Sequence, residues 1–212
     1  MTRALRYTGW TLISAGAVVL LYVVYSLFFT SFATRAAQSD LSEEWDRQVE
    51  VQVAEAPDPE EDSDPPAVDP GGAFAVLEFS RPGTDERPVH ADPLYIVSGV
   101  GMADLTRGPG HYPGTAEPGG EGNLAIAGHR TTYGAPFYHL DQMVEGDEIH
   151  VTGRDGERHT YRVARTEVVQ PGDVWVVGSD PLETETPMLT LTTCHPRFSA
   201  AQRFVVFAEL VT

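Results

Sequence analysis

An apolar segment near the N-terminus has no polar face. It begins at Trp10 and reads WTLISAGAVVLLYVVYSLFF, without a charged residue. Such a run matches the ~20 residues that an α-helix needs to cross the hydrocarbon core of a bilayer. Arg3 and Arg6 come before it, and positively charged flanks are retained on the cytoplasmic side. The pattern predicts a cytoplasmic N-terminus at 1–9, a transmembrane signal anchor at 10–30 and the rest of the chain outside the cell.

A cleaved signal peptide is the alternative interpretation of the same segment. Ser31, Phe32 and Ala33 offer the small-x-small pattern of a cleavage site. The apolar run is, however, longer than the ~7–15 residues of a signal-peptide core. We therefore favour an uncleaved anchor and a single-pass protein of the cell membrane.

Acidic residues and prolines dominate the segment after the apolar run. Residues 40–69 hold twelve Asp and Glu against one arginine, and the segment ends in EAPDPEEDSDPPAVDPGG. With few large apolar side chains, such a chain cannot bury enough surface to offset the conformational entropy that is lost on ordering. Its like charges also repel one another and extend it. We predict a disordered, acidic, Pro-rich linker over 31–72 that contributes to no core.

From residue 73 onward, the pattern changes to short apolar runs of β type separated by Gly and Pro. Helical patterning is short and weak, at 102–106 and 136–143. The predicted strands are 74–79, 94–98, 123–127, 148–152, 160–169, 188–193 and 203–210. Many strands with little helix favour an all-β domain over 73–212, built as a closed β-barrel or a sandwich.

The formal net charge of −17 narrows the range of partners. Binding to nucleic acid depends on clustered positive charge, which releases counterions from the phosphates. The fourteen basic residues of this chain are outnumbered by thirty-one acidic ones. A nucleic-acid partner is therefore not expected.

Cys194 is the only cysteine, so no disulfide can form within the chain. The residues before it, TLTT, have β character, and His195 and Pro196 follow. Because proline cannot continue a central ladder, the strand is expected to end at the cysteine. The thiol then lies at a strand end beside a loop, where reactive groups are usually displayed.

A reactive thiol needs an acid/base group within hydrogen-bond reach, and seven histidines are candidates. His195 is adjacent to Cys194 in sequence, but successive side chains on a strand point to opposite faces. His129 instead ends the apolar run LAIA, directly after Gly128, which permits close approach. Taken alone, His129 fits a structural hydrogen-bonding residue as well as a catalyst.

Two segments resemble the signatures of the sortase family. GNLAIAGHR is similar to the sortase histidine motif, and LTLTTCHPRFSAAQR is similar to the nucleophile strand, with an arginine that opens the next strand. The stretch GPGHYPGTAEPGGEGNLAIAGHRTTYGAPFYHLD resembles class E, a group of actinobacterial housekeeping sortases. The resemblance extends from residue 74 to the C-terminus and implies a closed sortase-type β-barrel with short helices.

The resemblance also implies a catalytic set. Cys194 would be the nucleophile of a cysteine transpeptidase, His129 its general acid/base, and Arg203 the group that holds the substrate carbonyl. Arg197 is nearer to the thiol in sequence. We prefer Arg203 because it begins the final apolar strand, and we expect Arg197 to be a solvated loop residue.

The activity implied by the resemblance is the joining of secreted proteins to the cell wall. The enzyme would cleave a C-terminal sorting signal similar to Leu-Ala-x-Thr-Gly between Thr and Gly, through a thioester. An amine of a lipid-linked peptidoglycan precursor would then displace the enzyme. Thr193, Leu191 and Tyr133 are the candidate substrate-binding residues, with barrel packing as the alternative for Leu191. An inactive anchored binding module and a hydrolytic cysteine peptidase remain alternative functions.

No cofactor and no metal are expected. Some sortases bind calcium through acidic residues near the substrate groove, and Glu145, Asp147 and Glu148 are available for such a site. Acidic residues clustered at one turn are, however, more often solvated. We therefore interpret these three residues as a solvated loop.

Overall fold

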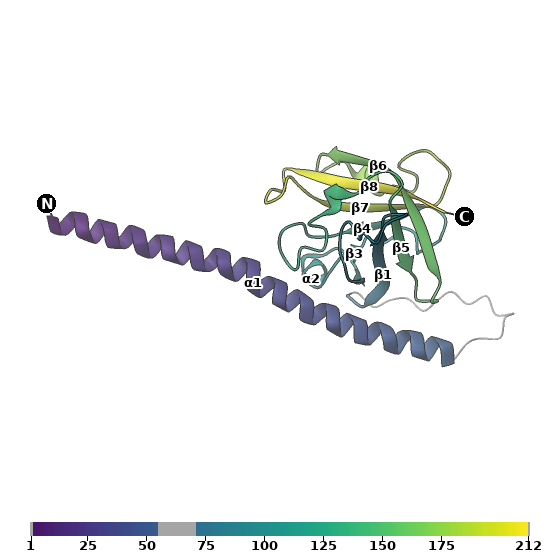
Figure 1. Cartoon of the computed structure of the whole chain (residues 1–212), viewed down its shortest axis with the longest axis horizontal. Coiled ribbons are helices and arrows are strands. Elements are labelled where there is room, and N and C mark those ends of the chain that lie inside the picture. The colour runs from purple at the N-terminus through teal and green to yellow at the C-terminus, as the bar shows by residue number, and fades with distance from the viewer. Residues whose placement is uncertain (1, 55–70, 212) are drawn as a thin grey trace.

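In the computed structural model, residues 2–54 and 71–211 are described. Eight strands close into a barrel in the order β1-β2-β3-β4-β7-β8-β6-β5 (Figure 1). The strands are β1 (Ala73–Ser80), β2 (Leu94–Ser98), β3 (Gly110–His111), β4 (Asn123–Ala127), β5 (Glu148–Thr152), β6 (Arg158–Val169), β7 (Met188–His195) and β8 (Gln202–Leu210). The helices are α1 (Thr2–Ala54), α2 (Met102–Leu105) and two 3-10 turns, η1 (Leu140–Gln142) and η2 (Val174–Val177).

The prediction of an all-β closed barrel is confirmed, and each predicted strand is present. Strand β3 was missed because two residues are too short to carry an alternating pattern. The helix predicted over 136–143 is reduced to η1. Its N–H groups make tight turns instead, since Tyr138 donates to the Ala135 carbonyl at 3.0 Å and Leu140 to the Phe137 carbonyl at 3.2 Å.

Strand alternation divides the apolar residues of β7 and β8 between two clusters. Leu189, Leu191 and Val206 belong to the barrel interior. Met188 and Phe207 belong to a second cluster, with Val169, Val176 and Val205. Val176 comes from η2, so the segment between β6 and β7 covers part of the outer face of β7 and β8. Along β7 and β8, the positions that alternate with Met188, Val205 and Phe207 therefore face the barrel interior.

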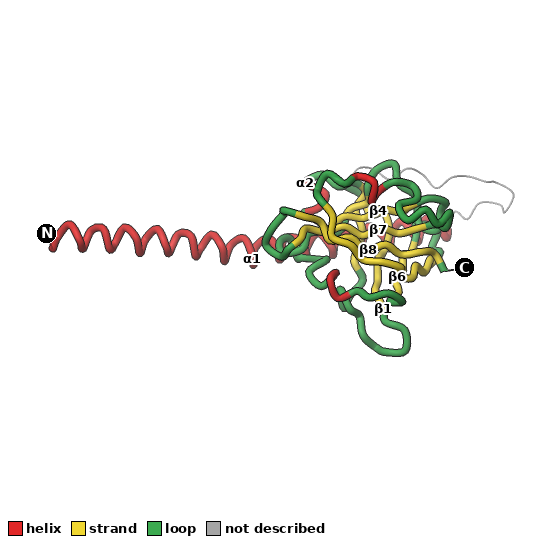
Figure 2. Tube along the Cα trace, turned by 90° about the horizontal axis from the view of Figure 1, so that it is seen from above, coloured by secondary structure: helices red, strands yellow, loops and turns green. Residues whose placement is uncertain are grey.

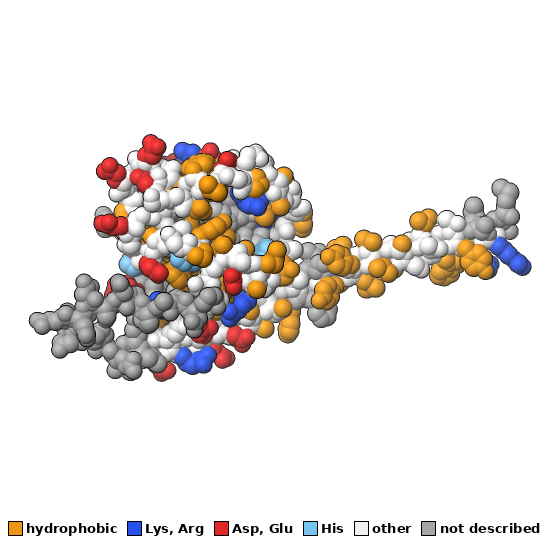
Figure 3. Space-filling view, turned by 180° about the vertical axis from the view of Figure 1, so that it is seen from behind, with side chains coloured by type: hydrophobic (Ala, Val, Ile, Leu, Met, Phe, Trp, Pro, Cys, Tyr) orange, Lys and Arg blue, Asp and Glu red, His pale blue; other side chains and the backbone are white. Residues whose placement is uncertain are grey.

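Helix α1 leaves the barrel at its N-terminal end and runs beside it further along (Figures 1 and 2). Within Arg6–Glu50 it is long and apolar enough, by length and composition, to cross a membrane. Hydrophobic side chains lie along the projecting part (Figure 3). The span predicted over 10–30 lies in this part, and the side chains from Thr11 to Tyr25 are exposed.

The second half of α1 corrects one prediction from sequence. Residues 31–54 are helical, not a disordered linker, and some of the side chains between 34 and 49 pack on the barrel. Leu41 and Trp45 are buried in a third apolar cluster with Ala73 and Val97 of the barrel. Leu41, Trp45 and the partly buried Val49 are four residues apart, which is the spacing of one helix face. The acidic composition concealed this narrow apolar stripe. Residues 55–70 of the predicted linker lie outside the described residues.

Polar contacts fix the same interface. The Gln38 amide donates to the Tyr95 carbonyl at 2.8 Å and accepts from the Tyr95 N–H at 2.9 Å. The side-chain amide thereby pairs with both backbone groups of Tyr95 in β2, as a strand would. Thr34 donates to the Thr106 carbonyl at 2.8 Å, and the Glu44 carboxylate accepts from the Ala73 N–H at 3.1 Å. Paired backbone groups and a buried apolar stripe together hold α1 against the barrel.

This packing gives a testable expectation for stability. In a chain shortened to residues 31–212, Leu41→Ala is expected to lower the free energy of unfolding by about 2–3 kcal/mol, because a fully buried leucine leaves a cavity. Asp40→Ala, on the exposed face, is the control. Denaturant titrations compare the two, and equal effects would contradict the docking. A chain beginning at residue 73 is still expected to fold, since the interior and outer clusters contain no residue of α1.

Candidate active site

The ends of β4 and β7 lie side by side. These strands are parallel, with Ala127 paired to Thr192, and the Gly128 N–H donates to the Thr192 carbonyl at 3.0 Å. His129 and Cys194 each lie two residues beyond the last pair. The register therefore brings the two side chains to neighbouring positions at the same edge of the sheet. By alternation, both share the outer face with Ala127 and Thr192.

Strand β8 approaches the cysteine from the other side. It is antiparallel to β7, and Cys194 is paired directly with Arg203. Directly opposite residues have Cβ atoms ~5 Å apart and project to the same face. Cys194 is half-buried. By register, Cys194 thus lies between the position of His129, which follows β4, and that of Arg203 on β8.

His129 is half-buried beneath its own loop. Its ring lies 4.8 Å from that of Tyr133, measured between centroids, and its carbonyl accepts from the Phe137 N–H at 3.1 Å. A Cβ at Gly128 would approach the Phe137 ring to 2.5 Å, so only glycine permits this close packing. Among the described residues, the buried Nε2 has no hydrogen-bond partner. This nitrogen is therefore not engaged in a structural hydrogen bond within the described part of the chain.

Burial lowers the pKa of His129 below its ordinary value of 6.5, because removal of water disfavours the charged form. The imidazole is therefore mainly neutral at neutral pH and ready to act as a base. We expect the acid limb of the kcat/KM profile to have its midpoint below 6.5, since activity falls as His129 is protonated.

Removing the ring that covers His129 tests this origin of the shift. Tyr133→Ala is expected to admit water and to move the acid limb upward, towards the ordinary histidine value. Tyr138→Ala is the matched control, because Tyr138 contacts the ring of His139 instead. Rate profiles of the two variants between pH 5 and 8 supply the comparison. An upward shift in Tyr138→Ala alone would contradict burial by Tyr133 as the cause.

Arg203 and Arg197 are separated by their contacts. The Arg203 side chain donates to the carbonyls of Ala200 and Gln202 at 3.1 and 3.0 Å, at the start of β8. Arg197 instead donates to Asp141 at 2.9 Å and lies over the Tyr138 ring, 4.4 Å from its centroid. Arg197 is thus not the solvated loop residue that was expected, because its guanidinium is engaged in an ion pair and a stacking contact.

The three candidate substrate-binding residues differ in position. Leu191 is completely buried in the barrel interior, so the packing alternative describes it. Thr193 is 3% exposed and donates to the Gly128 carbonyl at 2.7 Å, which ties the ends of β7 and β4 together. Neither side chain presents surface to a substrate. Tyr133 is half-buried against His129, and its role in substrate binding stays a prediction.

A buried arginine was missed in the sequence. Arg130 is 3% exposed, and its guanidinium donates to the Cys194 carbonyl at 3.2 Å and contacts Asp141 at 2.8 Å. Its place directly after His129 was the only available signal. Charged residues are seldom buried without a partner, and a composition count does not reveal which arginine has one.

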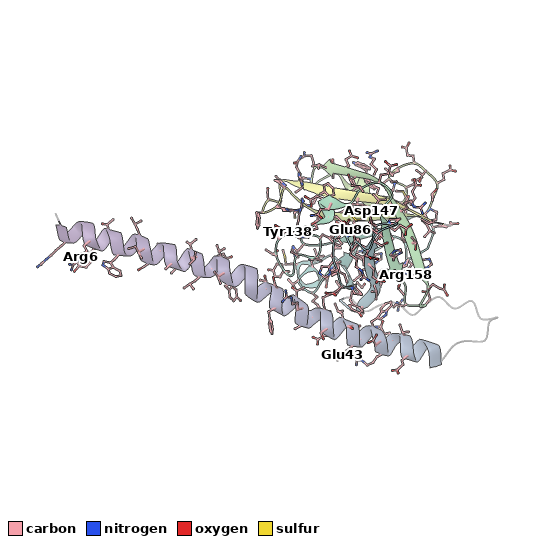
Figure 4. The ribbon with its side chains drawn as sticks, in the orientation of Figure 1. Arg6, Glu43, Glu86, Tyr138, Asp147 and Arg158 are labelled. Atoms are coloured by element: carbon pink, nitrogen blue, oxygen red, sulfur yellow. The ribbon has the colours of Figure 1, made fainter. Side chains whose placement is uncertain are left out.

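Two of the three acidic residues considered for calcium, Asp147 and Glu148, are engaged in ion pairs. Asp147 is buried and pairs with Arg81, which also pairs with Glu86; Figure 4 labels both acidic residues on the barrel. Glu148 pairs with Arg162 at 3.1 Å. Asp147 is therefore not the solvated residue that was expected. Within 2–54 and 71–211, no group of three His, Cys, Asp or Glu side chains is arranged to hold a metal ion.

A cysteine with an acid/base group and a cationic donor at neighbouring positions is a set of groups that can carry out acyl transfer. The family model described as Sortase domain matches residues 88–211. Sortase SrtE1 of Streptomyces coelicolor is 30% identical over 226 residues, which cover 98% of this chain and 57% of that protein.

Solved structures agree with these sequence matches. Sortase E from Streptomyces avermitilis is 34% identical with a TM-score of 0.57, over 68% of this chain and 91% of that one. Sortase E1 from Streptomyces coelicolor, with a tripeptide in its active site, is 30% identical with a TM-score of 0.58, over 69% and 92%. The chain belongs to the sortase family, and its relatives place it in class E. It spans little more than half, 57%, of the SrtE1 sequence.

Proposed function

We propose that this protein is a membrane-anchored cysteine transpeptidase that joins secreted proteins to a cell-wall precursor. The observation that supports this most directly is the strand register. Parallel pairing of β4 with β7 and antiparallel pairing of β7 with β8 put His129 and Arg203 on either side of Cys194. An inactive barrel has no requirement for these three groups at one strand end.

The first half of the reaction forms a thioester. His129 takes the proton of the Cys194 thiol, and the sulfur attacks the carbonyl carbon of the substrate threonine. Arg203 stabilises the negative charge that develops on the carbonyl oxygen. When this intermediate collapses, the bond to the glycine nitrogen breaks and His129 gives its proton to the departing amine.

The second half transfers the acyl group. An amine of the acceptor attacks the thioester carbon, His129 removes the proton of the attacking nitrogen, and Arg203 again stabilises the oxyanion. The new amide forms as the carbon–sulfur bond breaks, and the proton returns from His129 to Cys194. The partition between this amine and water decides whether the enzyme joins chains or hydrolyses them.

The proposed substrate is a C-terminal sorting signal of the form Leu-Ala-x-Thr-Gly. Similarity to class E sortases supports this class of peptide, and one relative was solved with a tripeptide in its active site. The proposed acceptor is the amine of a lipid-linked peptidoglycan precursor. The proposed location is the cell membrane, crossed once by α1 with the barrel outside, because Arg3 and Arg6 precede the apolar run.

Mass analysis of reaction products tests the proposal. The full chain in detergent micelles is incubated with a fluorogenic Leu-Ala-x-Thr-Gly peptide, with and without triglycine as amine acceptor. A new amide at the threonine is expected only in the presence of the amine. Release of the free acid alone would identify a hydrolytic peptidase. Absence of cleavage, while a methanethiosulfonate reagent still labels Cys194, would identify an inactive binding module.

A further inference from the structure

We propose that Arg130 is a positioning residue for the transpeptidation reaction, an inference that rests on the proposed function. Its buried guanidinium holds the end of β7 and so fixes the direction in which Cys194 presents its thiol to His129. Arg130 touches no atom that changes bonding in the reaction. It acts on the backbone of the nucleophile and follows the general base in sequence.

Three chain segments meet at this one side chain. From its place after β4, the guanidinium donates to the Cys194 carbonyl at 3.2 Å and to His195 Nδ1 at 2.9 Å, both at the end of β7. It pairs with Asp141 of η1 at 2.8 Å. The Phe204 ring of β8 lies 5.8 Å from the guanidinium carbon. Arg130 therefore connects the strand ends that carry all three proposed catalytic residues.

The contact with His195 fixes the tautomer of that ring. A guanidinium can only donate hydrogen bonds, so His195 Nδ1 must accept and the proton must be on Nε2. A ring held in this way against Arg130 supports the end of β7. It is not free to serve as a proton shuttle for the neighbouring thiol. The contacts of Arg130 with the end of β7, called the Arg130 clamp below, therefore give two adjacent residues different roles. Cys194 is the nucleophile, and His195 supports the strand end.

The charge of Arg130 is balanced by a shared carboxylate. Asp141 accepts from Arg130 at 2.8 Å and from Arg197 at 2.9 Å, which links the β7–β8 loop to the same cluster. Arg130 Nε is buried without a hydrogen-bond partner among the described residues. Leaving a donor of a buried cation unpaired is costly. Retention of the cation here fits a demand for its planar set of donors, which lysine cannot reproduce.

Steady-state kinetics of the full chain in detergent micelles test the clamp. Arg130→Gln and Arg130→Lys are expected to lower kcat by ~10²-fold, because a small misplacement of reacting groups is enough for such a loss. KM is expected to stay within about threefold, since substrate contacts are unchanged. Arg81→Gln is the matched control. Arg81 also pairs with a buried aspartate and touches the Gln142 carbonyl of η1, but it has no described contact with β7.

Alkylation of Cys194 adds a readout that does not require turnover. In the Arg130 variants, the rate with a methanethiosulfonate reagent is expected to fall at neutral pH, where the thiol depends on His129 to accept its proton. The rates should converge with that of the unchanged chain in strongly alkaline buffer, where hydroxide removes the thiol proton without help from His129. A purely structural loss would lower the rate at every pH.

The outcomes separate this inference from the proposed function. Unchanged kcat in Arg130→Lys, or equal loss in Arg81→Gln at the same loss of melting temperature, would overturn the positioning role. If the unchanged chain cleaves no peptide, the proposed function fails, and the alkylation profiles still decide on the clamp. Profiles that coincide for Arg130→Lys and Arg81→Gln would then reject it. If Arg130→Gln does not fold, Arg130→Lys carries the comparison alone.

Discussion

His129→Ala is expected to lower the rate of peptide cleavage by about 10²–10⁴-fold, the usual contribution of a general acid/base. His195→Ala is expected to retain most of the activity. The reason is geometric, because the register aligns only His129 with Cys194 on the outer face, while His195 Nδ1 is engaged by Arg130. Initial rates with the fluorogenic peptide at pH 7 measure the difference.

Two controls accompany this comparison. Cys194→Ala sets the background rate, and His159→Ala removes a histidine of β6, which is not adjacent to β7 in the barrel order. The compared variants, His129→Ala and His195→Ala, should unfold at temperatures close to that of the unchanged chain. A larger loss in His195→Ala than in His129→Ala would reverse the assignment and make the adjacent histidine the base.

Arg203→Lys is expected to be nearly as damaging as Arg203→Ala. A guanidinium presents a planar fork of donors to a developing oxyanion, whereas an ammonium is a compact, mobile point charge. Loss of one such donor typically costs ~10²–10³ in rate, or roughly 3–4 kcal/mol. Arg197→Ala is expected to change the rate only mildly, because Asp141 keeps its contact with Arg130.

Cleavage rates of these variants decide between the two arginines. Cys194 should still be alkylated in Arg203→Lys, since the thiol and His129 are unchanged. A strong loss in Arg197→Ala together with a small loss in Arg203→Ala would transfer the electrophilic role to Arg197. Similar small losses in both would show that neither guanidinium stabilises the oxyanion.

The barrel could be predicted because its strands carry local signals. The β-type apolar runs in 188–193 and 203–210 indicate strands, and the Pro after His195 indicates where the first of these strands ends. The proximity of His129 to Cys194 could not be predicted from a local signal of this kind. It depends on β4 and β7 being neighbours, although more than sixty residues separate them, and it was inferred from resemblance. Only the register supplies a physical reason for it.

Two features had no local signal of this kind. The buried state of Arg130 depends on Asp141 and on the carbonyl of Cys194, which is 64 residues away in sequence. The docking of α1 depends on three apolar positions in an acidic segment, and their value appears only when β1 and β2 provide a complementary surface. In both cases the tertiary partner, not the residue type, determines the structure.

The unbroken course of α1 fixes how far the catalytic end of the barrel lies from the apolar run. Thr34 packs so closely on Gly134 that a Cβ there would approach the Thr34 methyl group to 3.1 Å. Gly134 belongs to the loop after His129, and the β7–β8 turn lies at the barrel end that faces the projecting helix (Figure 1).

At ~1.5 Å per residue, Thr34 is only ~8 Å beyond Phe29, the last residue of the apolar run. If that run crosses the bilayer, the catalytic end faces the lipid headgroups at a fixed height. A substrate that is itself tethered in the membrane would then lie on the same side of the bilayer as the loop after His129, close to its surface.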